Sequence, residues 1–213
     1  MLAAKNGRRL TPRRNAERTR ERIVKAAFEE IHRSGFRSAD VDRILAAAGV
    51  TKGALYHYFD GKDALGHAVV DEVIAKNTRE MWLRPLQHTE NPIDALIGVF
   101  HSIPLKRDDL RRGCPLNNLA QEMSPIDEGF RKRLATIFHN WQTGIAAALR
   151  DGQKRRVVRA DVDPKETATF LVATLQGYTS LAKNAQDVAV LRAGVRRSIL
   201  YLESMRPRIR ESR

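Results

Sequence analysis

The sequence has a single cysteine, Cys114, among its 213 residues. One cysteine excludes an intramolecular disulfide framework and a cysteine-based structural zinc site, and it favours a reducing compartment. Apolar runs of about eighteen residues, which a membrane-spanning helix needs, are also absent. Residues 1–22 are basic but lack the apolar stretch of a secretory signal. We therefore expect a soluble, cytoplasmic protein.

Motifs of catalysis and metal binding are missing as well. The six histidines lack the His-Glu-X-X-His spacing of a zinc protease, and there is no Gly-rich phosphate loop and no Ser-centred nucleophile turn. We therefore expect no enzyme activity, no cofactor and no metal. An all-α enzyme is the weakest of the alternatives.

Positive charge, in contrast, is abundant. Lys and Arg number 38 against 25 Asp and Glu, which gives a net charge of +13. Such an excess favours a polyanionic partner, above all nucleic acid, although it also simply promotes solubility. A nonspecific architectural DNA-binding protein would need nothing beyond this charge. Sequence motifs are therefore needed to distinguish such a protein from a sequence-specific DNA-binding protein.

Apolar residues recur at spacings of three and four, which predicts an all-α fold of about nine helices. Residues 1–15 form a polar, basic arm without predicted structure. Side chains that can cap a helix precede several of the predicted starts, as in Asn91-Pro92, Ser124-Pro125 and Asp163-Pro164. The predicted helices cover about 16–34, 40–48, 51–59, 62–86, 91–107, a short stretch after Cys114-Pro115, 125–150, 164–184 and 187–205.

The second and third predicted helices are short and flank a tight turn at Gly49. This arrangement is typical of a helix-turn-helix, whose second helix enters the major groove of DNA. In residues 51–59, Leu55 and Phe59 lie one turn apart and can be buried, which leaves other faces of the helix for contacts. Many helical proteins contain tight helix pairs, so the residues of this second helix carry the argument.

Residues 28–65 resemble the DNA-binding domain of the TetR family of bacterial transcriptional repressors. The resemblance rests on the run Gly-Val-Thr-Lys-Gly-Ala-Leu-Tyr-His-Tyr-Phe, which ends at Phe59, and on Lys-Asp-Ala-Leu, which ends at Leu65. It implies a three-helix DNA-binding domain, here residues 16–63, and an all-helical ligand-binding and dimerisation domain, here residues 64–213. At the level of motifs it covers about 40 residues, and beyond them only helix number and length agree.

The resemblance also implies roles for single residues. Base edges would be contacted by Lys52, Gly53 and His57, and phosphates by Thr51, Tyr56, Tyr58 and Lys62. Family members usually carry Thr or Ser near the start of the second helix, where this chain has Ala39 and Asp40, so Ser38 or Arg43 would supply that phosphate contact. The alternative is that the two tyrosines only pack and that His57 is an ordinary exposed histidine. The basic arm either follows DNA or is a solvated tail, and its cations are Lys5, Arg8, Arg9, Arg13 and Arg14.

The last two predicted helices carry apolar stripes suited to a dimer interface. The stripes are Leu171, Leu175, Tyr178 and Ala182 on one helix and Val188, Leu191, Val195, Ile199 and Leu202 on the other. By resemblance to the family, two helices from each subunit would form a four-helix bundle in a homodimer. The same stripes could equally face the core of their own subunit.

A ligand pocket is expected between the fourth helix and this interface, where apolar and polar residues mix. Its predicted residues are Phe100, His101, Ile103, Cys114, Leu116, Asn117, Phe138, Trp141 and Tyr178. The segment Gly113–Asn118 resembles the Gly-Cys segment of a family branch that includes regulators responding to electrophiles. Nearby arginines and a helix start would favour the Cys114 thiolate, whereas the alternative is a buried, inert thiol.

Together these features predict a dimeric, ligand-responsive transcriptional repressor. It would bind a palindromic double-stranded operator and leave it when an unidentified small molecule binds. The alternative is the nonspecific architectural DNA-binding protein, which would need no second helical domain of this length.

Overall fold

The computed structural model describes residues 12–207, and all of the regular structure in that range is helical. This confirms the predicted all-α class. The chain divides into two compact units, residues 1–69 and 70–213. Most of the predicted basic arm, residues 1–11, lies outside the described range. No helix between residues 12 and 207 is long and apolar enough to span a membrane.

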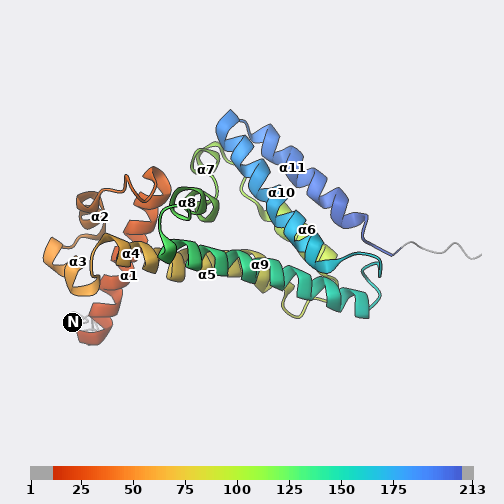
Figure 1. Ribbon diagram of the computed structural model, residues 1–213, viewed down its shortest axis with the longest axis horizontal. Coiled ribbons are helices and arrows are strands. Elements are labelled where there is room, and N and C mark those ends of the chain that lie inside the picture. Colours follow the sequence, from red (N-terminus) through yellow and green to blue (C-terminus); the bar gives the residue numbers. More distant parts are fainter. Residues whose placement is uncertain (1–11, 208–213) are drawn as a thin grey trace, which may run out of the picture. The chain divides into compact units, whose positions relative to one another are not determined.

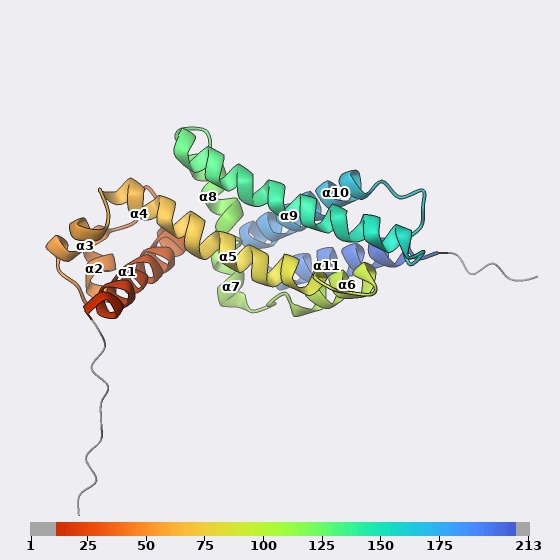
Figure 2. The same ribbon diagram turned by 90° about the horizontal axis from the view of Figure 1, so that it is seen from below.

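The first unit is a small cluster of four helices (Figures 1 and 2). They are α1 (Pro12–Ser34), α2 (Val41–Ala48), α3 (Lys52–Tyr58) and α4 (Lys62–Ala68). The start of α1 lies inside the predicted arm, because proline fits the first turn of a helix and the residues after it continue the helical pattern. Both α2 and α4 pack against α1, and α3 packs against α2.

Apolar side chains from all four helices meet in one core. Ile23 of α1, Ile44 of α2, Leu55 of α3 and Leu65 of α4 are each at most 1% exposed. At the end of α3, Phe59 is also buried, and the guanidinium of Arg20 lies 5.1 Å from the centre of its ring. The core therefore fixes α3 although this helix has only seven residues.

The chain is helical without interruption from Lys62 to Leu83, as predicted for the long fourth helix. Two stretches of it are π-helical, η1 (Val69–Ile74) and η2 (Arg79–Leu83), with α5 (Ala75–Thr78) between them. A 3₁₀ turn, η3 (Arg84–Leu86), ends it. π-helical turns are rare and frequently mark functional sites.

The second unit continues with six α-helices that surround a core of large side chains. Trp141, Phe100, Phe130 and Leu134 are each at most 2% exposed. The long helices α9, α10 and α11 lie side by side in Figures 1 and 2, with α10 between the other two. The helices are α6 (Pro92–Ser102), α7 (Arg107–Arg112), α8 (Pro115–Met123), α9 (Glu128–Lys154), α10 (Pro164–Ala185) and α11 (Val188–Glu203).

Two predicted boundaries in this unit were wrong. The helix expected over 91–107 ends at Ser102, because Ile103 precedes Pro104 and a residue before proline avoids the helical conformation. The short α7 that follows was not predicted. The helix expected from residue 125 begins at Glu128, since Asp127 provides the cap by accepting a 2.7 Å hydrogen bond from the N–H of Phe130.

Candidate DNA interface and ligand cavity

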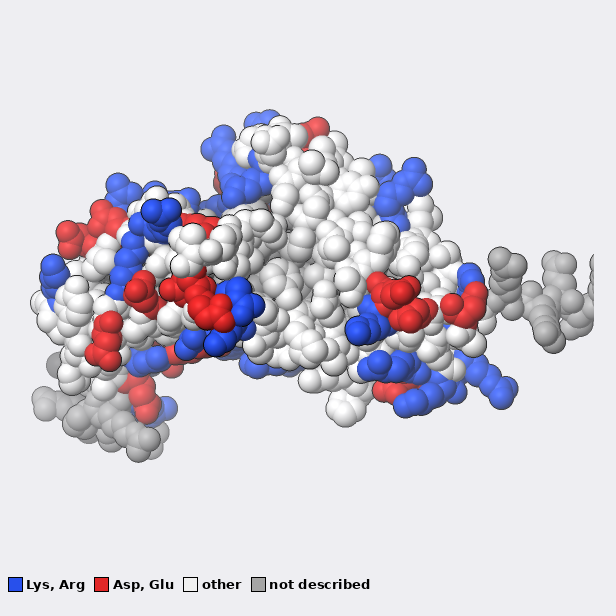
Figure 3. Space-filling model, viewed as in Figure 1, with Lys and Arg blue, Asp and Glu red and all other residues white. Residues whose placement is uncertain are grey.

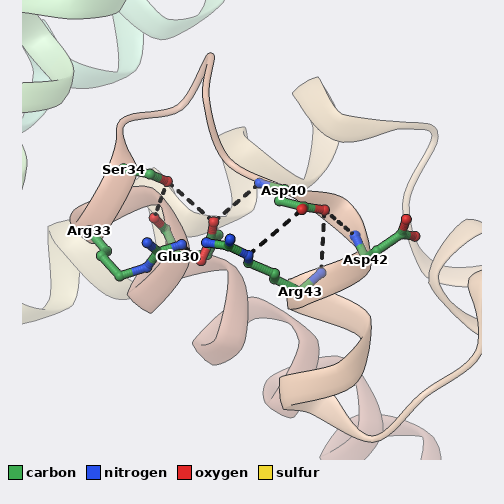
Figure 4. Close-up of polar contacts among 6 residues, drawn as sticks. All are labelled: Glu30, Arg33, Ser34, Asp40, Asp42 and Arg43. Carbon is green, nitrogen blue, oxygen red and sulfur yellow. Dashed lines mark hydrogen bonds and ion pairs between the residues drawn. The ribbon is translucent and has the colours of Figure 1, made fainter.

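A buried carboxylate joins the end of α1 to the start of α2 in the first unit. Glu30 is 8% exposed and accepts hydrogen bonds from Arg33 at 2.5 Å, from the Ser34 hydroxyl at 3.3 Å and from the Asp40 N–H at 3.3 Å (Figure 4). The hydrogen bond from Arg33 lowers the pKa of the Glu30 carboxyl against the opposing effect of burial. The loop before α2 is therefore held by a charged acceptor.

We expect Glu30→Ala to lower the free energy of unfolding by about 2 kcal/mol, because hydrogen bonds to a buried charged group are lost together. Glu21 lies on the same helix but is exposed, and Glu21→Ala should change stability by at most about 0.5 kcal/mol. Urea denaturation followed by circular dichroism measures both variants. Equal losses for the two would contradict the anchoring role of Glu30.

Local capping sets the turn between α2 and α3. Oδ1 of Asp40 accepts from the N–H of Asp42 at 2.8 Å and of Arg43 at 3.4 Å, so Asp40 caps α2 as predicted. Gly49 ends α2 with φ +61°, a left-handed conformation that glycine adopts without strain. Oγ1 of Thr51 then accepts from the N–H of Ala54 at 3.3 Å and caps α3. These contacts produce the predicted helix-turn-helix.

The outer face of α3 carries the residues expected at base edges. Lys52, Gly53 and His57 are exposed, as is Tyr56, of which 52% is accessible. Tyr58 is half-buried, and its ring meets the His57 ring edge-on at 5.0 Å between centroids. The solvent side of α3 thus presents a cation, a bare backbone position and two polar rings.

Nothing inside the unit requires glycine at position 53. A Cβ placed there would approach only Oγ1 of Thr51, at 4.0 Å, among the described atoms. Because glycine weakens a helix, its presence at an exposed helical position calls for another reason. Close approach of a partner to the α3 backbone is such a reason.

Lys62 makes contacts within the first unit that the sequence did not reveal. Its ammonium donates to the Arg37 carbonyl at 3.0 Å and lies 5.2 Å from the centre of the Phe36 ring. The side chain thereby ties the start of α4 to the loop between α1 and α2. The predicted phosphate contact of Lys62 stays a prediction, and it would use the remaining N–H groups.

Ser38 and Arg43, expected to replace the usual Thr or Ser, are both exposed. Arg43 lies 3.8 Å from the Asp40 carboxylate, an ion pair open to solvent (Figure 4). Exposed pairs of this kind contribute little free energy, so Arg43 can leave it for a phosphate.

One basic surface escaped the sequence analysis. Four cations are exposed on α1, namely Arg14, Arg18, Arg22 and Lys25. A shallow depression lies beside them, and its lining residues are Asn15, Arg18, Thr19, Glu21, Arg22 and Lys25. Their spacing of four, four and three residues places these cations on one helical face. That spacing was readable from the sequence, but a helix starting at Pro12 had not been predicted.

The second unit contains an apolar cavity of about 210 Å³. Trp82 of η2, Trp141 of α9, Gln176 of α10 and Leu191 of α11 line it, together with the stretch around Cys114 that opens α8. The rings of Trp82 and Trp141 meet with centroids 4.8 Å apart. The remaining lining residues are Met81, Ile103, Pro104, Asp109, Leu110, Gly113, Pro115, Leu175 and Thr179.

Of the predicted pocket residues, Cys114, Trp141 and Ile103 line this cavity, and the others lie elsewhere. Phe100 is buried with its ring 5.5 Å from that of Trp82, and His101 is exposed. Leu116 is buried in the core, and Phe138 is half-buried on α9. Asn117 donates a hydrogen bond to the Ser180 hydroxyl at 2.9 Å. Tyr178 packs on Gly194. Sequence reasoning missed Trp82 and Gln176, because helical spacing alone does not separate cavity from core.

Cys114 stands at the start of α8, as expected, but its thiol is not activated. Burial raises the pKa of the Cys114 thiol, and hydrogen bonds from the Asn117 N–H, the Gln176 side chain and the Leu116 N–H offset only part of this. The nearby Arg111 and Arg112 are exposed. The raised pKa favours the thiol over the thiolate, which supports the alternative of an inert thiol at this position.

The apolar stripes of the last two helices face their own subunit for the most part. Leu171, Leu175, Ala182, Leu191 and Leu202 are all at most 7% exposed. Of the two alternatives left open, these stripes therefore favour the core. A different set is exposed: Phe170 and Leu181 on α10, with 49% and 60% accessible, and Leu200 on α11, with 59%.

Two family models match this chain. Residues 23–69 match the bacterial regulatory proteins of the tetR family, and residues 91–197 match the tetracyclin repressor-like C-terminal domain. The transcriptional regulator AcuR of Cereibacter sphaeroides is 32% identical over 172 residues, which are 79% of this chain and 78% of that protein. The chain belongs to the TetR family of bacterial transcriptional regulators. Its relatives are regulators and not enzymes.

Other relatives of this TetR-family regulator agree. The HTH-type transcriptional repressor DhaR of Mycobacterium sp. strain GP1 is 29% identical over 74% of this chain and 79% of its own length. A crystal structure of regulatory protein TetR from Rhodobacter sphaeroides has 28% identity and a TM-score of 0.75, with 86% of this chain and 98% of that one covered. A TetR regulator from Chloroflexus aurantiacus has 26% identity and a TM-score of 0.78, with coverage of 91% and 98%.

Proposed function

We propose that this TetR-family regulator is a dimeric repressor that leaves a palindromic operator when a small molecule fills the cavity of its second unit. The observation that carries this proposal is the apolar cavity between η2, α8, α9 and α10. An apolar cavity with a few polar groups is typical of a small-molecule site. Since operator DNA lies in the bacterial cytoplasm, the protein would work there.

On the DNA side, the exposed face of α3 would enter the major groove. We assign base contacts to Lys52, Gly53 and His57, because these positions are open and Gly53 lets the backbone approach closely. The phosphate contacts would fix the register without reading sequence. They are assigned to Ser38, Arg43, Thr51, Tyr56, Tyr58 and Lys62, with Arg18, Arg22 and Lys25 of α1 added.

A homodimer would form through the exposed apolar side chains of α10 and α11. Phe170, Gly177 and Leu181 are spaced by seven and four residues and so lie on one face of α10. Within the described chain, a Cβ at Gly177 would meet no atom within 4 Å, which leaves room for a second helix to approach. The surface over α10 also shows few charged side chains (Figure 3).

The cavity is connected to the DNA-binding unit through the chain itself. Met81 and Trp82 line the cavity and belong to η2, at the end of the helix that begins at Lys62. In the proposed dimer the two copies of α3 must fall about 34–36 Å apart to reach successive major grooves. A ligand that shifts η2 can change this spacing, and a preference of about 5.5 kcal/mol for the released state would invert a 99:1 equilibrium.

Fluorescence anisotropy with two duplexes tests the DNA-binding part. One duplex carries the palindrome nearest to the regulator's own gene, and the other carries the same bases scrambled, at one fixed salt concentration. We expect the palindrome to bind at least about a thousandfold more tightly. A ratio near one would contradict sequence-specific repression and favour a nonspecific architectural protein.

Two single substitutions refine this measurement. Lys52→Ala should reduce the ratio between palindrome and scrambled DNA, because a base contact is lost. Arg22→Ala should instead weaken binding to both duplexes alike. Because the proposed dimer contains Arg22 twice, the slope of log K against log salt should fall by about 1.8. An unchanged ratio for Lys52→Ala would remove that residue from base recognition.

A further inference from the structure

Two buried polar atoms at the cavity of the second unit lack a partner. Within residues 12–207, neither Nε1 of Trp141 nor Oε1 of Gln176 has a hydrogen-bond partner. Both residues line the cavity, and they are only 2% and 8% exposed. Buried polar atoms of native proteins are nearly always paired, so each exception calls for an explanation. Here the exceptions are one donor and one acceptor at the same cavity.

Packing restricts both of these side chains. Gln176 is buried on α10, with only 8% of it exposed. The Trp141 indole packs against the ring of Trp82, 4.8 Å away, so it cannot easily turn towards another acceptor. The donor and the acceptor are therefore preorganised, which lowers the entropic cost of binding a matching ligand.

The lining also restricts the charge and size of a ligand. No basic residue is among the described residues that line the cavity, and the one acidic residue, Asp109, is exposed. A carboxylate or phosphate entering would lose its hydration without gaining a cation. At about 210 Å³, the cavity is smaller than the sites of drug-sized molecules, which begin near about 300 Å³. A small, uncharged ligand fits both restrictions.

We propose that the effector is a small uncharged molecule that carries a carbonyl oxygen beside an N–H or O–H group. The carbonyl accepts from Nε1 of Trp141, and the neighbouring group donates to Oε1 of Gln176. A primary amide is the simplest compound of this class. The inference rests on the proposed function, because it specifies which molecule would fill the regulatory cavity.

Isothermal titration calorimetry of the full chain tests this with matched probes. Benzamide, methyl benzoate, benzoate and toluene share a ring and differ only in the groups that could meet Trp141 and Gln176. Propionamide, methyl propionate and propionate repeat the comparison at smaller size. We expect the amide of at least one series to bind about tenfold or more tightly than the matching ester and carboxylate. Tighter binding of a carboxylate, or no binding in either series, would overturn the proposal.

Two substitutions link the affinity to the two atoms. Trp141→Phe removes the donor and Gln176→Met removes the acceptor, and each should weaken amide binding about tenfold while toluene binds as before. Thermal melting shows whether each variant is folded, and if Trp141→Phe is not, Gln176→Met alone decides. Unchanged amide affinity in a folded variant would refute the role of that atom.

Anisotropy with operator DNA separates this inference from the proposed function. If the amide binds and the palindrome stays bound to the protein, the proposed class of ligand is supported and the proposed release of DNA by ligand is refuted. If a carboxylate releases the palindrome, the proposed release of DNA by ligand is supported and the proposed class of ligand is refuted. Failure of the protein to distinguish the palindrome from scrambled DNA would count against the proposed function alone.

Discussion

Leu181→Glu is expected to leave each subunit folded but to dissociate the proposed dimer. Operator binding, which needs the dimer, should be lost as a result. Leu181 is 60% exposed on α10, in the stripe that includes Phe170 and Gly177. A two-fold interface would contain this residue twice, so the change would place two unpaired carboxylates in it. We expect the dissociation constant of the dimer to rise at least about a hundredfold, or about 3 kcal/mol. Sedimentation equilibrium measures it.

Ile126 supplies a matched control for this substitution. It is also 60% exposed, but it lies in the turn before α9 and outside α10 and α11. Ile126→Glu should leave both the association state and operator binding unchanged. If both variants remain dimeric, the interface lies elsewhere on the molecule.

Gly194→Ala is expected to cost about 3 kcal/mol of stability, near the upper end for an overpacked core position. A Cβ at this position of α11 would clash with Cγ of Tyr178 and would lie 2.7 Å from its Cβ. The Cβ of Tyr178 is fixed to the α10 backbone, so a rotamer change cannot relieve the contact and the two helices must move apart. Thermal denaturation followed by circular dichroism measures the loss.

Gly98 provides the opposite case for the same substitution. It is exposed on α6, and no described atom lies within 4 Å of a Cβ built there. Gly98→Ala should stabilise the helix by up to about 1 kcal/mol, because alanine has the higher helix propensity. A loss of thermal stability in both variants, or in neither, would contradict the close approach of α10 and α11 at Gly194.

Local signals in the sequence predicted most of the helices. Asp40 and Thr51 cap α2 and α3, and Asp163 caps α10, because a short polar side chain reaches the free N–H groups of a first turn. The start of α9 was misplaced because the sequence offers two such caps, at Ser124 and Asp127, and only packing decides between them. The π-helical segments also escaped, since no local pattern distinguishes them from an α-helix.

Prediction of the candidate sites was uneven for a physical reason. The exposed face of α3 follows from one short motif and a period of 3.6 residues, so Lys52 and His57 could be placed from sequence. The cavity instead combines side chains from η2, α8, α9 and α10, whose register depends on long-range packing. Gln176 shows the difficulty, because a polar residue in a buried stripe of α10 gave no sign that it faces a cavity.

The shortness of α3 has a genetic consequence. A helix of seven residues is not stable alone in water, so α3 exists only while Leu55 and Phe59 pack beneath it. If the chain acts as the proposed repressor, a screen for bacteria that have lost repression would therefore collect substitutions at Leu55 beside those at Lys52. Both would look like lost DNA contacts in the screen. Only the second kind would leave a protein with its full melting temperature.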